Sequence, residues 1–176
     1  MFIGHLPAGY LWTRLLLRRY KSASGANHHY RSYFALGLLG SVLPDLDLVY
    51  FYVIDRQQHL HHGYWTHLPV FWLGVLSASL AVSGVLRSRA LAVASIALIS
   101  NVLLHLLLDT VVGKIRWLYP LAATDFVLFP VAARYDWWVW NFVLHWSFLL
   151  ELALLAWAAA ALVAARKRVR VADMQV

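Results

Sequence analysis

Long apolar runs constrain the fold of this chain more than any other feature. Four runs, at residues 33–54, 68–86, 90–112 and 138–165, come close to or exceed the ~20 residues that a helix needs to cross a bilayer. Each must be helical, because an open strand edge in lipid would leave backbone hydrogen bonds unmade. Residues 1–17 form a fifth, shorter run. The sequence therefore predicts one domain over residues 1–176, an all-α membrane bundle of four to five spans.

Charge supports a membrane protein and predicts its orientation. Charged residues make up 13% of the chain, against about 25% in soluble domains. The net charge of +7 comes from basic residues clustered at the ends of apolar runs, which indicates membrane topology rather than nucleic-acid binding. If residues 14–31, 87–89 and 166–170 share one side, that side holds eleven of the fifteen Lys and Arg residues. The positive-inside rule makes it the cytoplasmic side.

Ionisable side chains gather toward the opposite, extracytoplasmic ends of the runs. Such groups are costly inside a membrane and are usually functional. His5 joins them if the first run crosses the membrane, whereas His28 and His29 fall on the cytoplasmic side and are expected to be solvated loop residues. The group comprises Asp45, Asp47, His61, His62, His67, His105, Asp109 and His145.

The spacing of these residues favours a metal site. Asn101, His105 and Asp109 are four residues apart and share one helix face. Pro44 breaks a helix just before two carboxylates in "LPDLD", and a broken helix is tolerated where it lines a site. Gly63 predicts a turn that aims His62 and His67 at the same ion. The chain has no cysteine, so the donors are nitrogen and oxygen, which favours zinc, with manganese or iron as alternatives.

Several of these ionisable residues could have a role other than binding the metal. One carboxylate of the PDLD element would bind metal while the other orients a ligand histidine or acts as general base; both could instead cap the following helix. His145 is expected to be a hydrogen-bonded residue between helices or an additional ligand. Glu151, inside the last run, is a proton carrier, a structural partner or a ligand in a second site. The predicted ligands are Asp45, Asp47, His62, His67, His105 and Asp109, with His5, His61, His145 and Glu151 as additional candidates.

Three motifs in this order resemble the YdjM family of inner-membrane metal-dependent hydrolases, which are sometimes described as LexA-binding. They are Pro44-Asp45-Leu46-Asp47, the His-rich turn ending in Thr66-His67, and His105 to Asp109 followed by Gly113 and Pro120. The family turn reads HRGxTH; here "HHGYWTH" lacks the arginine and has an extra residue, which leaves the choice between His61 and His62 open. More distantly, the pattern resembles zinc-dependent phospholipase C.

The resemblance implies a membrane hydrolase that uses metal-activated water. The substrate expected for a site at headgroup level is a lipid or a lipid-linked compound, with a phosphoester or phosphodiester favoured over an ester or amide. The rival hypothesis is a non-enzymatic metal transporter or a structural partner of another membrane protein. A transporter would need polar residues that continue to the cytoplasmic side, where the runs offer little besides Glu151.

Overall fold

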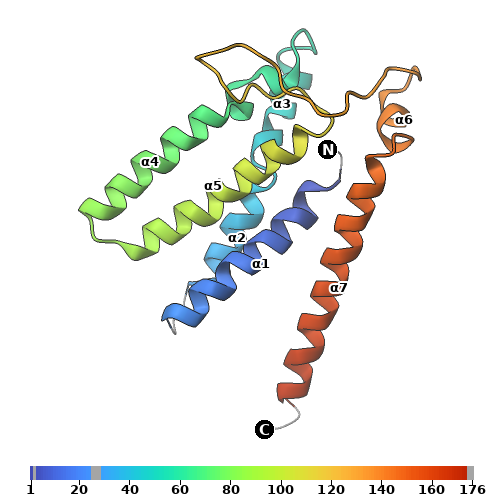
Figure 1. Ribbon diagram of the computed structural model, residues 1–176. Helices are drawn as coiled ribbons and strands as arrows, with labels where there is room; N and C mark the ends of the chain where they lie inside the picture. Colours follow the sequence, from blue (N-terminus) through green and yellow to red (C-terminus); the bar gives the residue numbers. More distant parts are fainter. Residues whose placement is uncertain (2, 25–28, 174–176) are drawn as a thin grey trace.

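Helices make up nearly all the regular structure of the chain. The computed structural model describes residues 1, 3–24 and 29–173, and within them it contains seven α-helices, three short 3-10 turns and no strand beyond a single bridge between Ile115 and Phe126. The predicted all-α class is therefore confirmed. The helices are α1 (His5–Ser24), α2 (Tyr30–Gly40), α3 (Asp47–Val53), α4 (Pro69–Val85), α5 (Arg89–Asp109), α6 (Trp138–Val143) and α7 (Phe148–Asp173) (Figure 1). The 3-10 turns are η1 (Pro44–Leu46), η2 (His61–Gly63) and η3 (Trp65–His67).

Fewer helices are suited to crossing a membrane than the four to five that the sequence predicts. By length and composition α5 and the Phe148–Lys167 part of α7 qualify, and the bent pair of α2 with Pro44–Val53 makes a third. Helix α4 has 17 residues, or about 26 Å at 1.5 Å per residue, short of the ~30 Å hydrocarbon core. Helix α1 is long enough at 20 residues, but its second half carries a cluster of basic residues. Helix α4 is thus too short, and helix α1 too highly charged, to count as a membrane span, although both segments are largely apolar.

The predicted break at the PDLD element is confirmed. Helix α2 ends at Gly40, and the chain resumes at η1 with Pro44 in the first turn, bent by 58° from α2. Proline has no N–H to continue a helical ladder, which explains the position of the bend. The interruption also leaves the backbone carbonyl of Ser41 available to a side chain of α5.

The predicted last span begins later than the sequence indicated. Residues 144–147 interrupt the apolar run between α6 and α7. There the Nδ1 atom of His145 lies 2.8 Å from the Ser147 hydroxyl and accepts a longer bond of 3.4 Å from the Ser147 N–H. Such local side-chain bonds compete with the helical ladder. The membrane-spanning part of this run therefore starts at Phe148.

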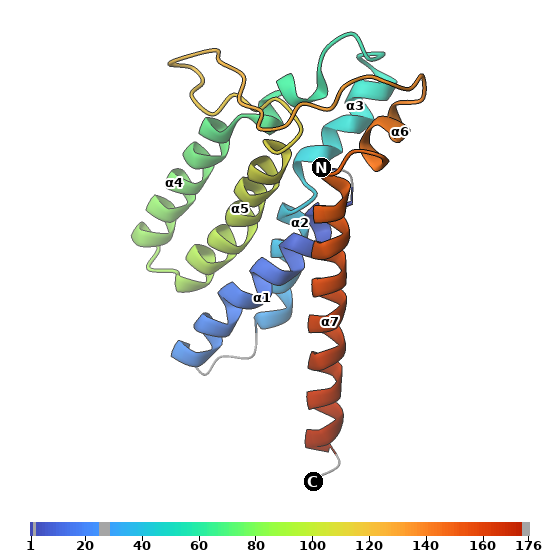
Figure 2. The same ribbon diagram turned by 45° about the vertical axis from the view of Figure 1, so that its right-hand side comes forward.

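Helix α5 lies at the centre of the bundle and packs against α1, α2 and α4. Its Ile99, Val102 and Leu106 form a buried core with Trp72 of α4 and Ile115. Helix α7 packs along α1 and extends past the other helices toward the C-terminus (Figure 2). All the short elements, α3, α6, η2 and η3, gather with residues 110–137 at the end of the bundle where the N-terminus lies (Figures 1 and 2).

Candidate metal centre

Four side chains from three separate elements meet at this end of the bundle. Asp45 lies in η1, His67 ends η3, and His105 and Asp109 occupy the last turns of α5. The Nε2 atom of His105 is 3.0 Å from Asp109 Oδ2 and 3.6 Å from Asp45 Oδ1. The Nε2 atom of His67 is 3.7 Å from Asp109 Oδ2 and 3.9 Å from Asp45 Oδ1. The structure thus brings four of the six predicted ligands to one point.

These distances fit a single metal ion. Tetrahedral ligands at 2.0–2.1 Å from zinc are separated from one another by about 3.3 Å, which falls within the observed 3.0–3.9 Å. The Nε2 atoms of both histidines and Oδ2 of Asp109 are buried and have no hydrogen-bond partner among the described residues. Buried polar atoms are rarely left unpaired unless water or an ion satisfies them. The donor set, two nitrogens and two oxygens, could therefore hold a divalent metal.

Hydrogen bonds on the far side of each ring aim the two histidines at this point. His67 donates from Nδ1 to Asp47 Oδ2 (2.8 Å), and His105 donates from Nδ1 to the Ser41 carbonyl (2.9 Å). The proton on Nδ1 leaves Nε2 of each ring with a free lone pair, as a metal-ligating histidine requires. The break after α2 is what supplies the Ser41 carbonyl. Sequence reasoning did not identify this contact, since a backbone acceptor carries no residue signature.

Asp47 lies outside the group of four potential ligand atoms. Besides His67, its carboxylate accepts hydrogen bonds from the Thr66 hydroxyl and from Nδ1 of His61, the latter at 3.0 Å. Asp47 therefore joins η2 and η3 to the start of α3 and orients His67. Of the two carboxylates in the PDLD element, the structure places Asp45 in the ligand group and Asp47 behind it.

The two neighbouring histidines of η2 have different environments. His62 faces the centre, with Nε2 3.7 Å from Asp109 Oδ2, and burial lowers the pKa of its imidazole to about 3, so the ring is neutral. A Cβ atom at position 113 would collide with the His62 ring, so Gly113 makes room for it. His61 is tied to Asp47 instead, although His61, His62 and His67 together form a second group with metal-ligand spacing.

The additional candidates divide into two kinds. His5 lies at the centre: its Nε2 atom is 3.1 Å from Asp109 Oδ1, and its ring stacks on His105 with centroids 3.8 Å apart. The amino group of Met1 also contacts Asp109. Glu151 lies outside the ligand group. It accepts hydrogen bonds from the backbone N–H groups of Ile3 and Gly4 and so fixes the position of the chain that leads to His5.

The remaining predicted polar residues serve the fold around the centre. His145 stays in the α6–α7 turn with Ser147, outside both metal-ligand groups. Asn101 shares the face of His105 as expected, but its amide donates to the Thr13 hydroxyl (2.9 Å) and fastens α1 to α5. His29 stands just before α2, at the opposite end of that helix from Ser41, and His28 lies outside the described residues.

The loop before η2 contains a carboxylate–histidine pair that the sequence reasoning missed. Asp55 accepts hydrogen bonds from the backbone N–H of His59 (2.9 Å) and lies 2.6 Å from its Nδ1 atom. The His59 hydrogen bond lowers the pKa of the Asp55 carboxyl. The spacing of four residues between Asp55 and His59 is the sequence signal that could have revealed this pair.

Comparison with known proteins identifies the family. No curated protein and no solved structure matches this chain. The profile of the YdjM inner membrane proteins matches residues 1–172, nearly the whole length, including the four candidate ligands and Asp47. The sequence resemblance noted from three motifs is thereby confirmed, and the chain belongs to the YdjM inner membrane protein family.

Proposed function

We propose that this protein is a membrane-embedded, metal-dependent hydrolase that holds zinc with Asp45, His67, His105 and Asp109. One observation carries the proposal: buried, unpartnered Nε2 atoms of His67 and His105 converge with Oδ2 of Asp109. Without a metal, the buried Nε2 atom of His67 would have no partner closer than 3.7 Å, at a cost of about 1–3 kcal/mol, and His105 would need an extra proton to pair with Asp109 Oδ2 at 3.0 Å. Zinc held by all four side chains would need a fifth position for water, or would have to exchange the exposed Asp45 carboxylate for it; water bound in this way would have its pKa lowered to about 7.

Of the four candidate ligands, Asp45 is the one that the described residues leave exposed. The Asp45 side chain is 30% exposed, whereas those of His67, His105 and Asp109 are at most 2% exposed. Substrate would therefore approach past Asp45, next to the neutral ring of His62. An imidazole with so low a pKa is a weak base at neutral pH, so the Asp45 carboxylate of the sequence-based hypothesis is kept as the candidate general base.

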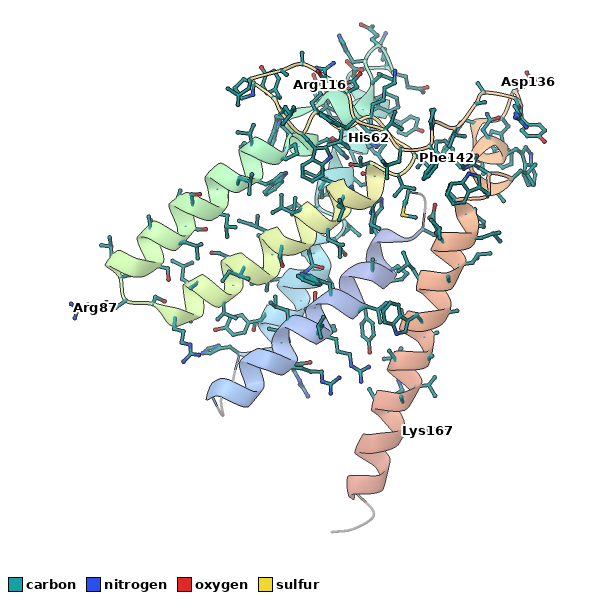
Figure 3. The ribbon with its side chains drawn as sticks, viewed as in Figure 1. His62, Arg87, Arg116, Asp136, Phe142 and Lys167 are labelled. Atoms are coloured by element: carbon teal, nitrogen blue, oxygen red, sulfur yellow. The ribbon has the colours of Figure 1, made fainter. Side chains whose placement is uncertain are left out.

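A lipid or lipid-linked phosphoester is the substrate class that the surroundings favour. Leu46, which follows Asp45 in the chain, is 57% exposed, and on the following helix α3 Val49 is 66% and Val53 70% exposed. Such a surface suits contact with acyl chains. Most basic residues lie at the other end of the bundle, where Figure 3 labels Arg87 and Lys167 opposite His62. By the positive-inside rule the centre would then face the extracytoplasmic side.

Metal analysis combined with a substrate screen tests the proposal. The wild-type protein, purified in detergent without chelators, is expected to carry about one zinc ion per chain. The variants His67→Ala and His105→Ala are expected to lose it, while His29→Ala, at the opposite end of the bundle, retains it. Mass spectrometry of phospholipids and polyprenyl phosphates incubated with each protein would detect hydrolysis. Product formation at the same rate by wild type and His105→Ala would refute the enzymatic role.

A further inference from the structure

A cavity of about 560 Å³ lies between α1, α2 and α7, far from the metal centre. Two of its residues, Arg14 and Arg18, are on α1, about 14 and 20 Å along the helix from His5 at 1.5 Å per residue. The cavity therefore belongs to the basic end of the bundle. Nothing in the metal chemistry uses it.

Three guanidinium groups supply the charge of this cavity. Arg14 and Arg18 come from α1 and Arg31 from the first turn of α2, and no acidic residue is among the described residues that line the cavity. Within the described part of the chain, no carboxylate lies within ion-pair distance of these three side chains. Three cations close together without a counter-charge make an anion site, and guanidinium suits phosphate because it can form two parallel hydrogen bonds.

The position of Arg14 is set by its own hydrogen bonds. It donates to the Tyr10 hydroxyl (3.3 Å) and to the carbonyl of Ala161 on α7, and is only partly buried. A guanidinium has five N–H groups, so several remain for a ligand. The rings of Tyr10 and Tyr30 both pack against the ring of Phe34, at centroid distances of 5.7 and 6.0 Å, and the three rings form an aromatic wall. The site is thus held by packed side chains of α1 and α2 and by a hydrogen bond to the backbone of α7.

Two of the three arginines also line a second cavity. It has a volume of about 410 Å³, lies between α1, α5 and α7, and shares Arg14 and Arg18 with the first. The rest of its lining is apolar and includes Leu11, Leu104 and Leu154. A charged cavity and an apolar groove that share two guanidinium groups match a molecule with an anionic head and a hydrocarbon tail.

We propose that the two cavities together bind an anionic phospholipid, with its phosphate on Arg14, Arg18 and Arg31 and an acyl chain in the apolar groove. Basic sites between helices at the cytoplasmic ends of membrane proteins commonly take anionic headgroups. The groove distinguishes this ligand from free phosphate, which would leave it empty. The binding site is independent of hydrolysis at the metal centre, because no residue is shared between them.

Native mass spectrometry of the whole chain in a neutral detergent tests this inference. Titration with palmitoyl-oleoyl phosphatidylglycerol is expected to show tighter binding than titration with the matching phosphatidylcholine. The variant Arg18→Gln/Arg31→Gln keeps the more buried Arg14 and is expected to weaken phosphatidylglycerol binding by at least about tenfold. The matched control is Arg87→Gln/Arg89→Gln, which removes the same charge at the α4–α5 turn, outside both cavities.

The apolar groove is tested separately. Leu154→Trp fills it and keeps every guanidinium, so phosphatidylglycerol binding should fall in this variant too. Displacement of the lipid by excess inorganic phosphate would instead identify a soluble anion as the ligand and overturn the proposal. Equal binding of the two lipids by wild type would also overturn it, as would equal losses in the two double-arginine variants or unchanged binding in Leu154→Trp.

Discussion

The variant Asp47→Asn tests whether Asp47 binds the metal directly or only orients the ligand His67. Asp47 is not one of the four residues whose ligand atoms converge. It contacts one of them, His67, whose Nδ1 atom donates a hydrogen bond of 2.8 Å to the Asp47 carboxylate. The amide of asparagine has nearly the same shape but only one acceptor oxygen for the three donors of His61, Thr66 and His67. The change should therefore loosen one of four ligands and leave the others in place.

The expected effect is a loss of about 10–100-fold in zinc affinity, the usual consequence of removing a partner of a ligating histidine. This loss equals about 1.4–2.7 kcal/mol of binding free energy. Competition against a chromophoric zinc chelator, with protein in detergent, measures it. Asp55→Asn is the matched control, since Asp55 bonds His59 in the neighbouring loop, outside the ligand groups.

Two outcomes would refute this assignment of Asp47. Affinity within about twofold of wild type, well below the expected range, would mean that the carboxylate does not orient His67. Complete loss of zinc, equal to that of Asp109→Asn, would make Asp47 a direct ligand, as one reading of the PDLD element predicts. The intermediate result alone is consistent with the geometry.

Two further predictions concern topology and packing. The chain has no cysteine, so a single cysteine in place of Arg134 should react with an impermeant thiol reagent from outside the cell, and one in place of Arg168 should not; the reverse pattern would put the metal centre in the cytoplasm. Gly40→Ala should destabilise the protein by about 1–3 kcal/mol, because a Cβ atom there would collide with the backbone carbonyl of Leu98 on α5. Gly74→Ala meets nothing within 4 Å and should stabilise α4 by up to about 1 kcal/mol; equal thermal unfolding curves for the two variants would contradict this reasoning.

Local regularities made several features of this protein predictable. His105 and Asp109 had to share a helix face, because four residues make slightly more than one helical turn. Pro44 had to interrupt its helix, because it lacks the N–H that the ladder needs. The apolar runs required helices, and the absence of cysteine limited the donors to nitrogen and oxygen. Each of these conclusions depends on residues adjacent in the chain or one turn apart.

The span count could not be read from hydropathy alone. The interruption at residues 144–147 depends on bonds between His145 and Ser147 that compete with the helix, and an apolar window does not register them. Helix α1 looked like a shorter span, yet its Thr13 is buried against Asn101 and its Arg14 reaches the backbone of α7. Such contacts depend on polar groups, and a hydropathy average only lowers the score of a segment that contains them.

The division of roles among the clustered carboxylates and histidines was decided by tertiary structure. Asp45 and Asp47 are two residues apart in a tight turn, so they point in different directions, and which one faces His105 depends on how η1 docks against α5 and η3. In the same way His62 turns toward Asp109 because Gly113, far along the chain, leaves room for its ring. Sequence periodicity relates neighbours along one helix. It carries no information on the separation of side chains from different helices, and that separation determines which atoms can share an ion.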